Sequence, residues 1–223
     1  MAITQTLRPF RDYDEKDVIN LYTYSGSVVD AQYKIQATKG TIVKIAGDGF
    51  RNDVEPLEML GNFGAFNVNN WVGQRYGVVP KVTAGGTGDA NYLGMLLFDV
   101  RELDENELPL KYNPRKAAEM EAVLSGQAVP VVTRGIFLYS GITTGVNKVA
   151  VTAGNPVYVN ANGGLTSDGQ AVSAQTVSGG YVPAYARQKA VGTFLGTTGS
   201  VQATGNQYGT DNSAIALVWL NIT

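Results

Sequence analysis

The stretch AIALVWLNI, residues 214–222, is apolar on both of its alternating sets of side chains. One set comprises Ala214, Ala216, Val218 and Leu220, and the other comprises Ile215, Leu217 and Trp219. Successive side chains of a β-strand point to opposite faces, so this pattern predicts a strand that is covered on both faces.

Most of the remaining chain carries strand and turn signals. KGTIVKIAGDG (39–49) predicts a strand that ends at a Gly-Asp-Gly turn. Further strands are predicted within 71–83, 92–100, 129–141, 156–160 and 191–196, and AGGTGDAN (84–91) is predicted to be a loop. Residues 166–188 are rich in Ser, Gly and Ala, which is typical of a long excursion between strands.

One segment, NPRKAAEMEAVLSG (113–126), predicts a helix. Asn113 can cap the first turn, Pro114 suits the first helical position, and Gly126 supplies a stop signal. The residues predicted to share the face toward the sheet are Ala117, Met120, Val123 and Leu124.

Composition excludes several classes of function. The 223 residues include no Cys and no His, so Ser-His-Asp, Cys-His and His-based zinc chemistry are unavailable. The formal net charge is −2 and no basic run is visible, which argues against a nucleic-acid partner. No stretch approaches the roughly 20 apolar residues of a membrane helix. We therefore predict no catalytic residue, no cofactor or cofactor-binding residue, no metal ligand and no membrane partner.

Two acidic stretches are the places to look for a cation site. In RDYDEKD (11–17), Lys16 takes the position of the third ligand of an EF-hand loop and no Gly follows, so a solvated turn or a helix start is the favoured interpretation. RELDENELP (101–109) receives the same interpretation. The Gly-rich stretches 84–94 and 196–205 lack the spacing of phosphate-binding loops and are predicted to be turns.

Tyrosine is the more informative aromatic residue, with 12 Tyr against 2 Trp. A sugar-stacking surface is one interpretation of a group that comprises Tyr139, Tyr158, Tyr181 and Tyr185. Packing in a core or subunit interface is favoured instead, because no amide or acidic cluster accompanies these residues.

The order of motifs in the second half of the chain resembles that of head decoration proteins of tailed bacteriophages. The motifs are PVVTRGIFLYSG (130–141), VTAGNPVYVNANGGLTS (151–167), AVGTFLGTTG (190–199) and ALVWLNI (216–222). The first half is similar to virion structural proteins of marine and cyanobacterial phages, through residues 6–26, 74–82 and 93–106. The segment 166–188 is longer than the family pattern.

Residues and resemblance together predict an all-β fold, a β-barrel or β-sandwich, with one short helix near residues 114–125 and an extended N-terminal arm. The expected division of the chain is an arm (1–25), a first β unit (26–112), the helix (113–126) and a decoration-protein-like β domain (127–223). An arm without a core of its own is expected to become ordered on a partner.

The resemblance implies a structural virion protein, not an enzyme, that binds the outside of a capsid and stabilises the expanded shell by bridging major capsid subunits. The implied partners are the major capsid protein and further copies of this chain, as a homo-oligomer such as a trimer. The chain would be synthesised in the host bacterial cytoplasm and located on the capsid exterior. The residues expected to contact the capsid are Leu7, Arg8, Pro9, Phe10 and Tyr13.

Two alternatives stay open. A tail, neck or fibre component of the virion shares the β-rich, cysteine-free composition. A carbohydrate-binding module or a glycan-degrading enzyme on the virion surface would use the Tyr residues and the acidic stretches.

Overall fold

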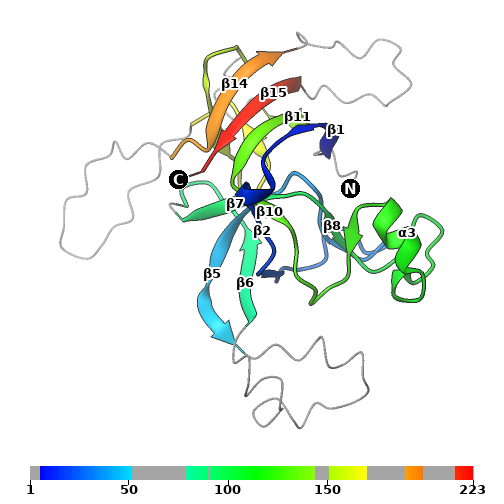
Figure 1. The fold of residues 1–223 in the computed structure, drawn as a ribbon. Coiled ribbons are helices and arrows are strands. Elements are labelled where there is room, and N and C mark those ends of the chain that lie inside the picture. Colours follow the sequence, from blue (N-terminus) through cyan, green and yellow to red (C-terminus); the bar gives the residue numbers. More distant parts are fainter. Residues whose placement is uncertain are drawn as a thin grey trace.

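The described residues of the protein form three β-sheets. The computed structural model describes residues 6–51, 79–89, 91–143, 151–169, 189–197 and 214–222. The described part consists mainly of strands with a single short α-helix (Figure 1), so the prediction of an all-β fold is confirmed.

Sheets A and B each contain six strands, and sheet C contains three. In spatial order, sheet A contains β1 (Thr6–Asp12), β11 (Arg134–Ile142), β15 (Ala214–Asn221), β14 (Gly192–Thr197), β12 (Pro156–Val159) and β13 (Leu165–Thr166). Sheet B contains β2 (Val18–Ile19), β10 (Val131–Val132), β7 (Tyr92–Leu96), β5 (Ile42–Arg51), β6 (Val79–Ala84) and β3 (Thr23–Tyr24). Sheet C contains β4 (Ile35–Ala37), β8 (Asp99–Arg101) and β9 (Ala122–Val123). The helices are η1 (Glu15–Asp17) and η2 (Leu110–Tyr112), both 3-10, and α3 (Pro114–Glu119).

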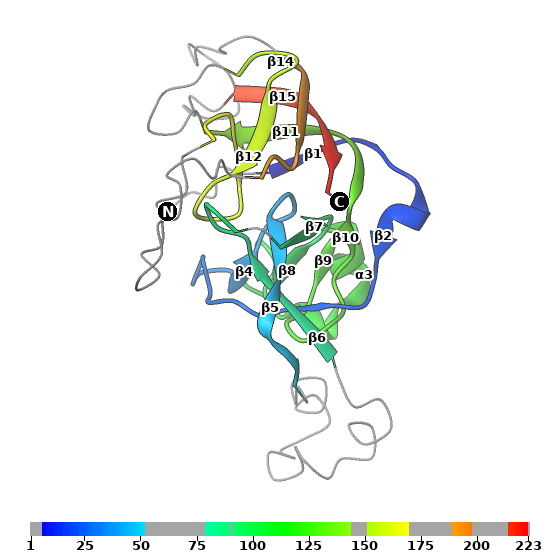
Figure 2. The same cartoon turned by 90° about the vertical axis from the view of Figure 1, so that its left-hand side faces the viewer.

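The centre of sheet B is buried on both faces, and the sheet lies below sheet A in Figure 2. Ile42 of β5 packs into a core shared with sheet A, and the next residue, Val43, packs into a second core shared with sheet C. Met95 and Leu96 of β7 divide between the two cores in the same way. A strand covered on both faces needs apolar side chains in consecutive positions, which explains the apolar pairs Ile42–Val43 of β5 and Met95–Leu96 of β7.

Sheet A, in contrast, buries only its inner face along β15. Ala216, Val218 and Leu220 are each at most 1% exposed, whereas Trp219 is 43% exposed. The prediction that residues 214–222 are covered on both faces is therefore wrong. The alternation of apolar residues places the strand correctly, but it does not reveal that one apolar face stays on the surface.

The Gly-Asp-Gly turn predicted at 47–49 is also wrong, because β5 continues as a strand to Arg51. Its pairing with β6 shifts register between Ile45 and Phe50. Gly47 and Gly49 can be accommodated at an irregularity of a strand as well as in a turn. The long pairing of β5 with β6 favours the strand.

The helix begins as predicted and ends early. The Asn113 side chain accepts a hydrogen bond from the Lys116 N–H, and Pro114 occupies the first turn. The helix stops at Glu119, and Glu121 has a φ of +52°, which a helix cannot continue through. The chain then enters β9, whose parallel pairing with β8 includes Val123. Tertiary pairing outweighs the helical pattern at 122–125.

Residues 6–24 are not an arm that lacks a core. β1 pairs with β11, β2 with β10 and β3 with β6, so the segment contributes to sheets A and B. Leu7 is 2% exposed and Tyr24 6% exposed within the two cores. Sheet B takes two strands from the predicted arm and takes β10 from beyond residue 126. The sheets therefore do not follow the predicted division of the chain.

Candidate functional site

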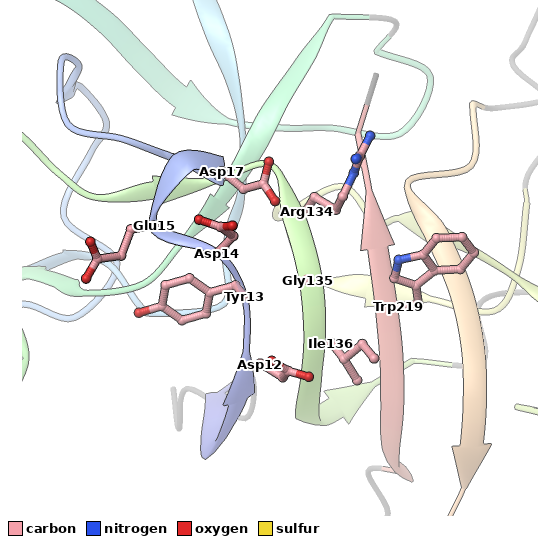
Figure 3. Close-up of a pocket in the computed structure, with 9 residues that line it drawn as sticks. All are labelled: Asp12, Tyr13, Asp14, Glu15, Asp17, Arg134, Gly135, Ile136 and Trp219. Carbon is pink, nitrogen blue, oxygen red and sulfur yellow. The ribbon is translucent and has the colours of Figure 1, made fainter.

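A shallow surface hollow of about 600 Å³ lies where the chain leaves β1 and crosses the start of β11 (Figure 3). It is lined by Asp12, Tyr13, Asp14, Glu15, Asp17, Arg134, Gly135, Ile136 and Trp219. Figure 3 shows the acidic residues on one side of β11 and Trp219 on the other, with Glu15 pointing away. The hollow thus joins the first acidic stretch of the sequence to the exposed face of β15.

The acidic side of the hollow is a fixed turn. Asp14 caps η1 by accepting a hydrogen bond from the Lys16 N–H at 3.0 Å, which confirms the interpretation of 11–17 as a helix start. The Asp17 carbonyl oxygen accepts a hydrogen bond from the Thr133 N–H at 2.9 Å. Lys16 approaches Asp14 at 3.8 Å, but its side chain is 89% exposed, so this pair contributes little.

Gly135 allows this turn to lie close to β11. A Cβ atom added there would be 2.8 Å from the Tyr13 Cβ and 2.9 Å from the Asp12 carbonyl oxygen. The Tyr13 ring stacks on Phe137 with 5.9 Å between the ring centroids. Only glycine leaves room for the turn and for this ring contact together.

The other side of the hollow belongs to an apolar strip on the outer face of sheet A. Ile136 pairs with Trp219 and Leu138 pairs with Leu217, and directly paired residues of antiparallel strands share a face. The β14 residue Leu195 stands at a register shift beside Leu217 and is 42% exposed. We call Ile136, Leu138, Leu195, Leu217 and Trp219 the apolar strip. Sequence reasoning missed it because residues apolar on both faces of a strand indicate burial.

The five residues expected to contact the capsid fall into different environments. Leu7 lies in the core, so its prediction as a contact residue is corrected: in the folded protein no partner can reach it. Arg8 donates a hydrogen bond from Nε to the Ser140 hydroxyl at 3.1 Å. Pro9 is exposed, Phe10 is 53% exposed and Tyr13 is 37% exposed.

The exposure of Pro9 and Phe10 follows from an irregularity of β1. Its register shifts between Leu7 and Arg11, so residues 8–10 lie opposite Leu138 alone. An edge strand tolerates Pro9, because the missing N–H leaves no partner unsatisfied there.

The tyrosines offer no common sugar-stacking surface in the described part of the chain. Tyr139 is fully buried, and Tyr158 is half-buried against the position of Gly169. Burial raises the pKa of the Tyr139 hydroxyl far above its usual range. Tyr181 and Tyr185 lie outside the described residues.

The second acidic stretch is held by hydrogen bonds within its own loop and by ion pairs to other elements. The buried Asp104 accepts hydrogen bonds from the Asn106 and Leu108 N–H groups, each at 2.8 Å. Glu105 pairs with Lys116 at 2.5 Å, and this hydrogen bond lowers the pKa of the Glu105 carboxyl. In the Gly-rich loop that follows β6, Asp89 accepts a hydrogen bond from the Gly86 N–H, which confirms a turn.

Neither a metal centre nor a membrane span is found where the structure describes the chain. No three acidic side chains among the described residues are arranged to hold a metal ion. None of the helices in the described ranges combines the length and apolarity of a membrane span. The hollow and the apolar strip together form the candidate site.

Comparisons of the chain with protein-family models, with curated proteins and with solved structures found no match.

Proposed function

We propose that this chain is a structural virion protein that binds the outside of a phage capsid and stabilises the expanded shell by bridging major capsid subunits. The observation that carries the proposal is the apolar strip, in which Trp219 is 43% exposed, Leu195 is 42% exposed and the other three residues are half-buried. Contiguous exposed apolar surface of this kind marks interaction sites in soluble proteins. The order of strand motifs in residues 130–222 supports the phage assignment.

The proposed role needs binding and no chemistry. A protein that bridges subunits must present a rigid surface, and two cores shared among three sheets supply that rigidity. Symmetry repeats each contact over the shell, so individually weak contacts add up to strong retention. We extend the proposal to a homo-oligomer, such as a trimer, on the capsid exterior, synthesised in the host bacterial cytoplasm.

The copy number of the chain per particle, measured against the major capsid protein by quantitative mass spectrometry of purified particles, tests this function. A number commensurate with the shell lattice supports capsid decoration. A dozen copies or fewer would assign the chain to the tail, neck or fibre, which is the alternative function. Absence from particles would refute a virion role.

A further inference from the structure

We propose that the apolar strip and the acidic turn together form one docking face, and that its occupant is a segment of the capsid subunit with basic side chains next to apolar ones. We define the docking face as the apolar strip together with Asp12, Asp14 and Asp17. The inference rests on the proposed function. It assigns capsid binding to a defined face of sheet A and no longer to an arm of residues 1–25.

Strand pairing in sheet A places a carboxylate and two apolar side chains side by side across three neighbouring strands. Asp12 pairs with Ile136 on β11, and Ile136 pairs with Trp219 on β15. All three belong to the outer face, because Phe137, Val218 and Leu220 point into the core. Adjacent strands lie about 4.8 Å apart, so Asp12 and Trp219 are about 10 Å apart across Ile136. A long basic side chain can lay its apolar stem over Ile136 and reach the Asp12 carboxylate.

The charge on the docking face favours a basic partner. The residues that line the hollow include four carboxylates, from Asp12, Asp14, Glu15 and Asp17, and one guanidinium, from Arg134, so negative charge is in excess. The nearby Arg11 pairs with Glu121 at 2.6 Å. Lys16 stands out in solvent at 89% exposure. The carboxylates of the turn are therefore available to cations of a partner. Bidentate carboxylate contacts favour arginine among them.

A second copy of this chain suits the docking face less well. An identical face would present the same excess of carboxylates over the single guanidinium of Arg134. Like charges brought together across an interface are unfavourable. Charge complementarity thus selects a capsid segment over self-association through this face.

Binding of the full-length chain to purified heads that lack it tests the inference. The first variant is Trp219→Ser, matched by Leu108→Ser, which alters a 61% exposed residue in the loop before η2, outside sheet A. The second variant carries D12N, D14N and D17N, matched by E102Q, E105Q and E107Q in the other acidic stretch. Asn keeps the capping ability of Asp14, so the charge variant is expected to fold even if Trp219→Ser does not. Circular dichroism and the midpoint of thermal unfolding verify folding.

We expect Trp219→Ser to weaken binding at least about tenfold, as for a central aromatic of an interface, and Leu108→Ser to leave it unchanged. The charge variant should bind several-fold more weakly at about 50 mM salt, and its affinity should depend little on salt. The wild type and the matched acidic control should both lose affinity as salt rises to about 0.5 M.

Three results would overturn the inference. If wild type and all four variants bind equally, the docking face is wrong while the proposed function stands. If wild type fails to bind heads at any salt concentration, the capsid role falls, and the inference with it. If light scattering shows an oligomer that Trp219→Ser alone dissociates, a second copy occupies the face.

Discussion

At the scale of single residues, Gly135 fixes how the acidic turn meets sheet A. Gly135→Ala places a Cβ 2.9 Å from the Asp12 carbonyl oxygen, so either the turn or β11 must move. We expect a loss of about 1–3 kcal/mol in the free energy of unfolding, measured by urea denaturation. Gly196→Ala, on β14 of the same sheet, meets no atom within 4 Å and should change stability by less than about 1 kcal/mol. Equal losses in the two variants would contradict the steric argument.

Glu121 joins β1 to sheet C through two ion pairs. Its carboxylate lies 2.6 Å from Arg11 and 2.8 Å from Lys39. Burial alone raises the pKa of Glu121, but the hydrogen bonds from Arg11 and Lys39 outweigh it and hold the pKa below its usual 4.5. The half-buried Asp99, which accepts a hydrogen bond from the Lys39 N–H, has its pKa raised by desolvation.

The depressed pKa of Glu121 fixes the direction in which the stability of the fold changes as the pH falls. The ion pairs stabilise the fold fully above the unfolded-state pKa, and the stabilisation is lost as pH falls through the lower folded-state pKa. Glu121→Gln should therefore cost about 1 kcal/mol at neutral pH, a small value because the side chain is 35% exposed. Urea denaturation from about pH 7 to about pH 3 should show this difference shrinking. A difference that grows in acid would disprove the assignment.

At the scale of elements, β1 combines a structural half and a surface half. Leu7 is 2% exposed and Phe10 is 53% exposed in the same strand. Leu7→Ala should cost about 2–4 kcal/mol of unfolding free energy, whereas Phe10→Ala should cost less than about 1 kcal/mol. Thermal unfolding of both variants measures the contrast. If Leu7→Ala leaves stability unchanged, residues 6–12 are an arm after all.

The existence of the elements could be predicted from the sequence more readily than their ends. Apolar periodicity located β7, β11 and β15, because a strand in a core must present apolar side chains. The helix was predicted six residues too long at its C-terminus, since residues 120–125 have a helical pattern but gain more from pairing β9 with β8. The local sequence of residues 120–125 does not indicate that β8 will lie beside them and pair with β9.

The candidate site was predictable only in pieces. The acidic stretch 11–17 was recognised as a helix start, which it is. Its neighbour across the hollow, Trp219, is about 200 residues away in the chain, and no spacing rule links the two. Burial of a whole apolar strand was the simplest expectation for 214–222, and an uncovered face can be found only when the sheets are placed in space.

At the scale of the whole molecule, sheet B couples the two cores. Ile42 and Val43 are neighbours in β5, and each lies in a different core at 0% exposure. Ile42→Ala and Val43→Ala should each reduce the free energy of unfolding by about 2–4 kcal/mol. Each variant should still unfold in a single transition, with a lower midpoint temperature than the wild type. Scanning calorimetry with near-UV and far-UV circular dichroism tests this. Separate transitions for the two variants would show that the cores unfold independently.

The strand order of sheet A has a consequence for how the protein is made. β11 lies between β1 and β15, so its two neighbours come from positions about 130 residues before it and 80 residues after it. During synthesis on the ribosome, Phe137 and Tyr139 have no second strand beside them until residues 214–221 emerge. Contacts so distant in sequence slow folding, and the waiting strand exposes apolar surface to other nascent chains. Chaperone demand should accordingly be highest before β15 is translated, and only a chain that extends through β15 can display the docking face.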